Sequence, residues 1–319
     1  MKKSIAIIEI GTNSIKFCIA SKTNGIITTK DSVHVTRMGE NVHQTGQISS
    51  SAMERSLKKI EELYHQARKA GVFEIVAIGT MIFRHAANAD IFIQKIKSQC
   101  GVTIHVLSGN DEARLSYLAA ISSMNGISGY TVVLDTGGGS TELTFGKDQD
   151  IYRSMSFDIG AVFLTDNCCV HDPVTHHDIE CMVNEINKTI KIQPINRAVN
   201  YLIGSCGAIT TMAAVKHQIK QYHSNLIHGT RLTRRDVQKQ IQLFASKTIH
   251  QREQISGIQK GRADIVLAGA CIVECVMEKL QCDQILVCDR GLRYGVINRC
   301  FAPDNDPFSY LQVQCRCEP

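Results

Sequence analysis

The sequence predicts an α/β protein made of two related halves. Segments with the composition of β-strands alternate with segments whose apolar residues recur at helical spacing. A short motif also occurs twice, as E-x-G-x-x-S at residues 9–14 and as D-x-G-x-x-S at residues 135–140, and a strand-like segment follows each copy. The 319 residues, 44% of them apolar, are enough for two hydrophobic cores.

The first half should alternate strands and helices around its copy of the motif. Residues 5–20 are expected to form a strand, a turn and a second strand. Residues 51–70 are expected to be helical, because their apolar side chains fall on one face and Gly71 follows as a stop. The other expected elements are strands at residues 26–37, 75–78 and 103–107 and helices at residues 89–100 and 113–124.

A glycine-containing junction at residues 125–130 is the expected boundary, so we predict domains at residues 1–126 and 127–319. The tail from Ala302 holds three of the five prolines and is expected to be loosely ordered. The elements expected in the second half are strands at residues 132–134, 141–145, 151–157, 201–203 and 285–288 and helices at residues 179–192 and 265–280.

The turn in the second copy of the motif is expected to bind an anionic oxygen. Consecutive glycines can turn with positive φ and bring several N–H groups close to a ligand, and a following serine adds a hydroxyl donor. The residues concerned are Gly137, Gly138, Gly139 and Ser140. A plain glycine-rich hairpin with solvated acids is the alternative interpretation.

Two carboxylates flank this turn and favour a divalent cation. Asp135 precedes the glycines and Glu142 follows them, almost opposite across the expected hairpin. Two carboxylates beside a phosphate-sized cradle repel each other unless a hard cation lies between them, and oxygen ligands of this kind suit Mg²⁺ best. Glu9 holds the equivalent position in the first copy of the motif.

Further candidate residues follow other predicted strands, where α/β proteins commonly bind ligands. Arg84 follows one such strand, and Glu112 opens a helix that Ser108 should cap. An acid in a first helical turn needs no role beyond its interaction with the helix dipole, and a lone arginine is often a surface ion-pair partner, so these alternatives stay open. A second small-residue turn before a helix is another possible anion cradle and contains Gly204, Ser205 and Gly207.

The segment HDPVTHHD at residues 171–178 invites a metal interpretation. We favour a helix cap instead, because Asp-Pro interrupts regular structure and either Thr175 or Asp178 would cap the next helix. A metal site would also need convergent ligands from elsewhere in the chain.

Composition excludes several classes of function. The net charge of +5 is spread along the chain, which allows anionic ligands without requiring nucleic acid. No apolar stretch reaches the roughly 18 residues of a membrane helix, so no membrane role is expected. The thirteen cysteines include no C-x-x-C pair and lie mostly in apolar patterns, which suits reduced, buried thiols in the cytoplasm. The P-loop, dinucleotide and nucleophile-elbow motifs are absent from the sequence.

Eight segments, taken in order, resemble the exopolyphosphatase / guanosine pentaphosphate phosphatase family. They are residues 5–14 (IAIIEIGTNS), 76–88 (VAIGTMIFRHAAN), 107–115 (LSGNDEARL), 133–146 (VLDTGGGSTELTFG), 204–213 (GSCGAITTMA), 228–233 (HGTRLT), 262–270 (RADIVLAGA) and 287–295 (VCDRGLRYG). The resemblance implies the short form of the family, with two ribonuclease H-like domains of the actin, heat-shock chaperone and sugar kinase superfamily and a cleft between them. It also implies inorganic polyphosphate or guanosine pentaphosphate as the partner, leaves a homodimer open, and includes neither nucleic acid nor membrane.

The resemblance also assigns roles to individual residues. Glu112 would be the general base and Arg84 a phosphate contact, while Asp135, Glu142 and Glu9 would hold Mg²⁺ and position water. The further phosphate-binding residues it implies are Gly11, Thr12, Asn13, Ser14, Lys16 and Arg262 with the two turns named above. A long polyanion would be held by the cations nearest the motifs, namely Arg84, Lys16, Arg262, Arg290 and Arg293.

Three positions depart from the family pattern. Glu9 stands where aspartate is usual, Phe83 where small residues are common, and Ala208 where a hydroxyl is often present. A displacement of about 1 Å at a reacting centre can cost roughly 100-fold in rate. Two alternatives therefore stay open beside the hydrolase: a catalytically impaired homologue that binds polyphosphate or an alarmone, and an ATP-dependent kinase of the same superfamily.

Overall fold

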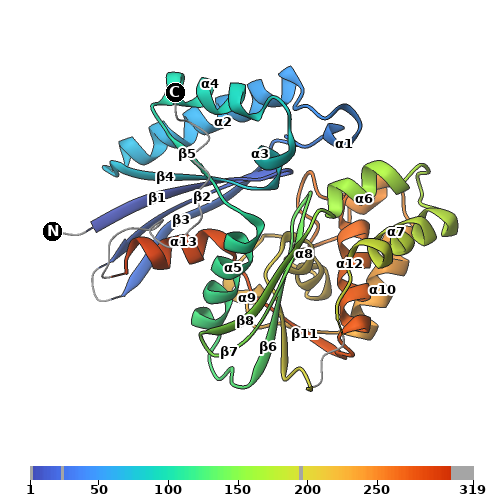
Figure 1. Cartoon of the computed structure of the whole chain (residues 1–319). Coiled ribbons are helices and arrows are strands. Elements are labelled where there is room, and N and C mark those ends of the chain that lie inside the picture. Colours follow the sequence, from blue (N-terminus) through green and yellow to red (C-terminus); the bar gives the residue numbers. More distant parts are fainter. Residues whose placement is uncertain (1–2, 23–24, 194–196, 303–319) are drawn as a thin grey trace. The chain divides into compact units, whose positions relative to one another are not determined.

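The structure, a computed structural model, describes residues 3–22, 25–193 and 197–302. The described chain divides into two compact units (Figure 1). The first contains the residues up to Leu115 and those from Leu292 onward, and the second is Ser116–Gly291. The expected tail after Ala302 lies outside the described residues.

The first unit is built on a five-stranded sheet in the order β3-β2-β1-β4-β5. Strand β2 is antiparallel to both neighbours, whereas β4 and β5 run parallel to β1. This is the arrangement of a ribonuclease H-like domain, as expected. The strands are β1 (Lys3–Ile10), β2 (Ser14–Lys22), β3 (Ile26–Val35), β4 (Glu74–Gly79) and β5 (Ile104–Val106).

Helices cover both faces of this sheet. The helices are α1 (Val42–Thr45), α2 (Ser50–Lys69), α3 (Met81–His85), α4 (Ala89–Cys100), the start of α5 (Gly109–Ser123) and α13 (Leu292–Cys300). Helices α2 and α4 share a core with Ile8, Ile10 and Phe17 on one face, while α13 packs on the other (Figure 1). Ser49 begins α2 by accepting a hydrogen bond from the N–H of Ala52.

The division differs from the expected boundary after residue 126. Helix α13 comes last among the described elements but packs against β1 and β2 of the first unit. There Arg293 pairs with Asp31 of β3 at 2.8 Å. Local sequence patterns do not reveal such a return of the chain, because it depends on tertiary packing between distant segments.

The second unit repeats the strand order of the first. Its sheet runs β10-β11-β9-β6-β7-β8, with β6, β7 and β8 antiparallel in succession and with β9 and β11 parallel to β6. The strands are β6 (Tyr130–Thr136), β7 (Thr141–Lys147), β8 (Asp150–Phe157), β9 (Tyr201–Gly204), β10 (Arg231–Thr233) and β11 (Gln284–Val287). The internal repeat inferred from the two motifs is therefore confirmed, with β10 as an added edge strand.

Residues of β6 alternate between the two faces of this sheet. Val132 and Leu134 belong to the larger core, to which buried α12 contributes most of its length, whereas Val133 packs with Tyr117 of α5 on the other face. The helices here are α6 (Ala161–Cys168), α7 (His176–Thr189), α8 (Gly207–Lys216), α9 (Ser224–Ile227), α10 (Arg234–Ala245), α11 (Ile249–Glu253) and α12 (Val266–Lys279). None of the helices in the described residues is both long and apolar enough to cross a membrane.

The prediction that the cysteines are reduced is wrong for one pair. Cys168, at the end of α6, and Cys181, on α7, form a disulfide. The pair joins two helices that pack together in space, so a search for close cysteine spacing could not find it. Nine other cysteines in the described residues are free, and seven of these are buried.

Candidate active site

The carboxyl ends of three neighbouring strands meet at one edge of the second sheet. Strands β6, β9 and β11 are parallel neighbours, and they lead into Asp135, Ser205 and Gly291. A Cβ atom added to Gly291 would lie 3.9 Å from both Asp135 Oδ2 and Ser205 Oγ, so these groups gather in one place. This edge is where open α/β sheets bind ligands.

Asp135 lies opposite another acidic residue in the sheet. Asp135 on β6 is the register partner of Glu142 on β7, and Glu142 is in turn the partner of Ser156 on β8. Like charges opposite each other destabilise a sheet unless something compensates them. Ser116 Oγ donates to Asp135 Oδ2 at 2.7 Å, and Ser156 Oγ donates to Glu142 Oε1 at 2.9 Å.

The donor set at this edge fits Mg²⁺ better than a transition metal. No group of three or more His, Cys, Asp or Glu side chains suited to a metal is found within residues 3–22, 25–193 and 197–302. Mg²⁺ keeps several waters and usually binds one or two carboxylates together with substrate phosphates. Asp135 and Glu142 are such a pair of carboxylates.

The triple-glycine turn is held from behind by helix α6. The N–H of Ala161 donates to the carbonyl of Gly137 at 3.0 Å, and the N–H of Val162 donates to that of Gly138 at 2.8 Å. Because a trans peptide directs its C=O and N–H to opposite sides, the N–H groups of Gly138 and Gly139 point away from α6. None of Gly137, Gly138 and Gly139 has the positive φ that the sequence suggested. The turn can therefore offer N–H groups to an anion only through the direction of these peptides.

A second cradle lies at the start of helix α8. Ser205 donates its N–H to the carbonyl of Leu134 at 2.9 Å, which ties this loop to β6. The Ser205 hydroxyl is buried and makes no hydrogen bond within the described residues. The Arg262 guanidinium lies so close to Gly207 that any side chain at Gly207 would collide with it. A helix N-terminus, a hydroxyl and a guanidinium are all groups that bind phosphate.

In the first unit, Glu112 and Arg84 form a largely buried pair. Arg84 Nη1 donates to Glu112 Oε1 at 3.0 Å and to the carbonyl of Leu107 at 2.8 Å. Glu112 is 5% exposed, so this pair is not a surface ion pair, whereas the position of Glu112 in the first turn of α5 still fits the helix-dipole alternative. The expected cap is also present, since Ser108 Oγ accepts a hydrogen bond from the N–H of Asp111 at 3.1 Å.

The turn between β1 and β2 has the same backbone hydrogen bond as its counterpart. Gly11 donates its N–H to the carbonyl of Ser14 at 3.0 Å, just as Gly137 donates to that of Ser140 at 2.8 Å. The carbonyls of Thr12 and Asn13 accept hydrogen bonds from the backbone at residues 36–39, which fixes the loop.

The Glu9 side chain differs from Asp135 in its cross-strand partner. Its register partner is Lys16, whose Nζ lies 2.6 Å from Glu9 Oε1. Glu9 is only 5% exposed, and its Oε2 is buried without a hydrogen-bond partner among the described residues. Lys16 thus neutralises Glu9 Oε1. Glu9 Oε2 is buried, and a hydrogen-bond donor or a cation beside it would stabilise it.

Residues 18–302 match the sequence model described as the Ppx/GppA phosphatase family. The chain belongs to this family. It is 29% identical to Exopolyphosphatase 2 of Mycobacterium tuberculosis, with 92% of this chain and 97% of that protein aligned. It is 25% identical to the guanosine-5'-triphosphate,3'-diphosphate pyrophosphatase of Vibrio parahaemolyticus, over 92% of this chain and 58% of that protein.

Solved structures of this family share the fold. The crystal structure of an exopolyphosphatase from Cytophaga hutchinsonii superposes with a TM-score of 0.85 at 25% identity, covering 93% of this chain and 97% of that one. The Ppx/GppA member from Aquifex aeolicus gives 0.76 at 28% identity, over 93% and 97% of the two chains. The chain spans 46% of another relative, a bifunctional 3-dehydroquinate synthase/phosphatase of Fusobacterium nucleatum, at 29% identity.

Two of the residues expected to depart from the family pattern, Phe83 and Ala208, are accommodated by local packing. Phe83 is buried, stacks on Phe92 with ring centroids 6.1 Å apart, and lies against Gly79, where a Cβ would come within 2.6 Å of its ring. Ala208 packs on Gly269 of α12, where a Cβ would lie 2.5 Å from the Ala208 Cβ. A bulkier residue at Ala208 would need α8 and α12 to separate.

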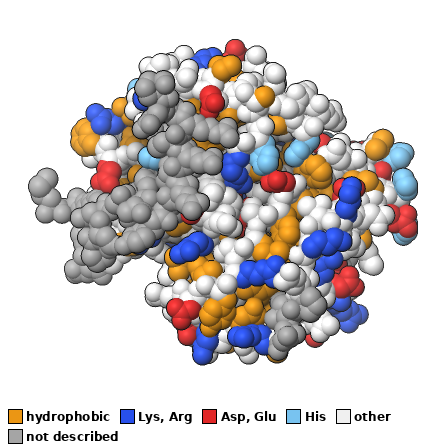
Figure 2. Space-filling model, viewed as in Figure 1, with side chains coloured by type: hydrophobic (Ala, Val, Ile, Leu, Met, Phe, Trp, Pro, Cys, Tyr) orange, Lys and Arg blue, Asp and Glu red, His pale blue; other side chains and the backbone are white. Residues whose placement is uncertain are grey.

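One of the cations expected to bind a polyanion is committed elsewhere. Arg293 is 7% exposed and pairs with Asp31, which also accepts a hydrogen bond from Tyr294 Oη at 2.5 Å. The expectation that Arg293 contacts a polyanion is therefore wrong. It arose because the sequence alone does not indicate that α13 packs on the first sheet and buries Arg293. On the face drawn in Figure 2, Lys and Arg side chains lie among Asp and Glu rather than in one continuous basic patch.

Sequence reasoning missed several groups at the candidate site. Ser116 lies four residues after Glu112 on the same helix, and this spacing was the only available signal. Ser156 could have been found from the register of three adjacent strands. Tyr222 donates its hydroxyl to Asp289, and the loss of water around this hydroxyl together with the Asp289 charge raises the pKa of Tyr222. Nothing in the local sequence indicates that contact.

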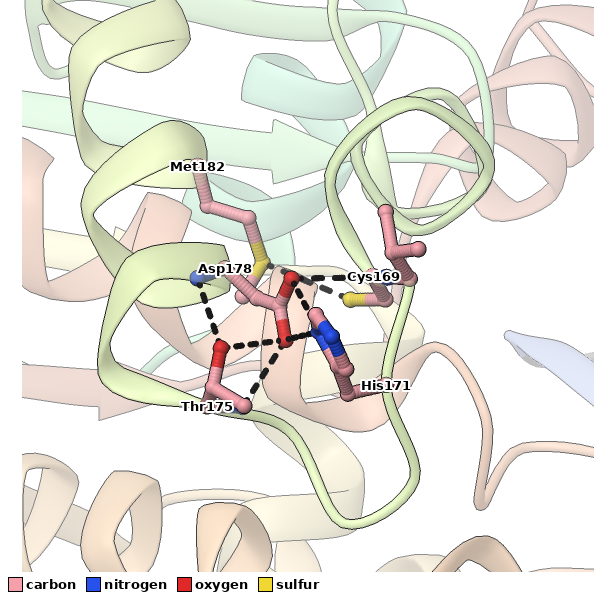
Figure 3. A network of polar contacts seen from close by, with 6 residues as sticks. Cys169, His171, Thr175, Asp178 and Met182 are labelled. Carbon is pink, nitrogen blue, oxygen red and sulfur yellow. Dashed lines mark hydrogen bonds and ion pairs between the residues drawn. The ribbon is translucent and has the colours of Figure 1, made fainter.

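The HDPVTHHD segment caps a helix, as favoured (Figure 3). Asp178 Oδ2 accepts hydrogen bonds from the N–H and Oγ1 of Thr175, both at 2.8 Å, and His171 Nδ1 lies 3.1 Å from the same oxygen. Burial alone would raise the pKa of Asp178, but the hydrogen bonds from Thr175 and His171 outweigh it and lower that pKa to about 2. The network stabilises the connection between α6 and α7.

Proposed function

We propose that this chain hydrolyses the terminal phosphoanhydride bond of inorganic polyphosphate, with guanosine pentaphosphate as a second substrate. Family membership and the printed names of the relatives support the substrate class. The observation that carries the chemistry is the buried Arg84–Glu112 pair, since a carboxylate beside a guanidinium can accept a proton where phosphate oxygens bind.

The proposed reaction is an in-line attack of water on the terminal phosphorus. Glu112 accepts a proton from water as the water oxygen bonds to phosphorus and the bridging P–O bond breaks. The shortened chain leaves with the bridging oxygen, and orthophosphate is released. Arg84 moves its donors onto the transferring phosphoryl group. The N–H groups of the glycine turn and Arg262 are the phosphate-binding groups that we propose in the second unit.

Asp135 and Glu142 would hold the Mg²⁺ in the second unit, and Glu9 of the first unit is proposed as a further metal ligand. When bound, the ion would neutralise charge on the phosphate oxygens. Lys16, the turn at residues 11–14 and the loop at residues 204–207 would bind further phosphates. We place the protein in the cytoplasm without a nucleic-acid or membrane partner, and a homodimer remains a prediction.

The test is the near-isosteric variant Glu112→Gln. It should lower kcat on polyphosphate by about 100-fold or more while leaving KM within a few-fold, because only the proton acceptor is lost. Glu54→Gln, an exposed acid on α2, is the matched control and should behave like the parent protein. Unchanged turnover in Glu112→Gln would exclude Glu112 as the base.

A binding protein is the second candidate, favoured by Glu9 and Ala208. Both depart from the usual pattern, and Ala208 is fixed by its packing on Gly269. Retained polyphosphate binding without phosphate release under any divalent cation would establish this candidate. Transfer of label from ATP to an acceptor would instead indicate a kinase.

A further inference from the structure

The hydroxyl of Ser116 is a buried donor to a candidate metal ligand. Ser116 is 2% exposed, and its Oγ lies 2.7 Å from Asp135 Oδ2. It stands on α5, one turn after Glu112, in a helix that packs on the β6 face from which Asp135 projects. Water has little access to replace this hydrogen bond.

A fixed donor matters here because of the charge opposite Asp135. Glu142 is the register partner of Asp135, so repulsion between the two carboxylates favours rotamers that turn them apart. A hydrogen bond to Oδ2 resists that rotation. Because a carboxylate has about four lone-pair positions, it can accept this bond and still bind a cation.

The chemical type of the donor is also informative. Lys16 neutralises Glu9 with a full positive charge, which competes with a metal ion. Ser116 is neutral, so it orients Asp135 without removing the negative charge that attracts a cation. Groups that orient metal ligands in this way change metal affinity by about 10- to 100-fold when they are removed.

We propose that Ser116 is a positioning residue that holds the Asp135 carboxylate in the orientation required to bind a divalent cation. This inference rests on the proposed function in one respect, which is that the bound cation takes part in phosphoryl transfer. Its direct consequence is a property of the protein and the metal alone, which can be measured without substrate.

The first measurement is Mn²⁺ binding to the full chain, followed by the loss of the free-ion electron spin resonance signal. Ser116→Ala should weaken binding about tenfold. Ser116→Thr keeps a hydroxyl and should restore affinity to within about threefold of the parent. Ser123 lies on the same helix, and its hydroxyl donates a hydrogen bond to the carbonyl of Ala120. The control variant Ser123→Ala removes this hydroxyl and should leave the Mn²⁺ affinity unchanged.

The second measurement separates this inference from the proposed function. In a phosphate-release assay, Ser116→Ala should raise the Mg²⁺ concentration for half-maximal rate about tenfold and leave the KM for polyphosphate within twofold. Thermal unfolding in EDTA checks that all variants fold. Equal Mn²⁺ affinity of the parent and Ser116→Ala, or no Mn²⁺ binding by the parent, overturns the positioning role. Weakened Mn²⁺ binding in a protein that releases no phosphate supports it and rejects the hydrolase.

Discussion

The turn between β1 and β2 and the turn between β6 and β7 share a backbone hydrogen bond but differ in the charge of the residues that flank them. In each, a glycine N–H donates to the carbonyl of the serine three residues later. Glu9 faces Lys16 across its hairpin, whereas Asp135 faces Glu142. The repeat thus preserves this hydrogen bond, and we expect the residue on the neighbouring strand to decide which ion each turn attracts.

This difference gives the two turns different electrostatic properties. Lys16 already compensates one oxygen of Glu9 at 2.6 Å, so the first turn has less need of a cation. In the second turn the register partner of Asp135 is the acidic Glu142, and the hydroxyls of Ser116 and Ser156 donate hydrogen bonds to these two residues. We therefore expect the second turn to dominate metal affinity, which the predictions below test.

The largest expected effect is on the Mg²⁺ requirement of activity. Asp135→Asn should raise the Mg²⁺ concentration for half-maximal rate by about 100-fold, because a charged oxygen ligand becomes neutral. Glu9→Gln, which keeps its length and an acceptor for Lys16, should raise it by less than about threefold. Metal titrations of phosphate release compare the two, and equal shifts would remove the distinction between the turns.

The same comparison predicts stability changes of opposite sign in EDTA. Lys16→Met leaves the buried Glu9 carboxylate without its cation and should destabilise the protein by about 2 kcal/mol. Glu142→Gln removes the repulsion across β6 and β7 and should stabilise it by up to about 1 kcal/mol. Urea unfolding of both variants without metal measures this, and a destabilised Glu142→Gln would show that the opposed carboxylates are not a repulsive pair.

The fold could be predicted from the sequence because the signals that indicate it are local in the chain. The repeated motif, the alternation of elements and the glycine turn predicted both sheets and the positions of Asp135 and Glu142. The return of α13, the Cys168–Cys181 disulfide and the Ser116 contact join segments distant in sequence or depend on the direction of a side chain. No periodicity encodes such contacts, so they required the three-dimensional structure.

A smaller effect is expected when Glu9 is shortened. Glu9→Asp introduces the residue that we expect to be usual in the family, but it withdraws the carboxylate from Lys16, whose Nζ lies 2.6 Å from Glu9 Oε1. We expect kcat to fall about tenfold, because an error near 1 Å at a reacting centre is costly. Phosphate release by Glu9→Asp alone and with Lys16→Arg, whose longer side chain can restore the pair, measures this. A higher kcat in Glu9→Asp would mean that the first turn has not adapted to the longer acid.

The smallest expected effect concerns the support behind the second turn. The first turn of helix α6 donates hydrogen bonds to the carbonyls of the glycine turn, and its last residue, Cys168, forms the disulfide with α7. The Asp178 network supports the connection between α6 and α7 (Figure 3). The pKa of Asp178 is lowered to about 2, below the usual value near 4 for an aspartate. Between these values the unfolded chain binds the proton more tightly, so the ionised carboxylate stabilises the fold above about pH 4, and this contribution is lost as the pH falls toward 2.

Asp178→Asn should therefore destabilise the protein by about 1 kcal/mol at pH 7, where it loses charge-assisted acceptors for Thr175 and His171. The difference between the variant and the parent should shrink as the pH falls from about 4 toward 2, because the parent then loses the same charge. Urea unfolding at a series of pH values measures it, with Glu54→Gln as the exposed control. If the difference stayed constant down to pH 2, the stabilisation would come from the shape of the cap rather than from its charge. In that case the α6–α7 connection would support the second turn equally at every pH.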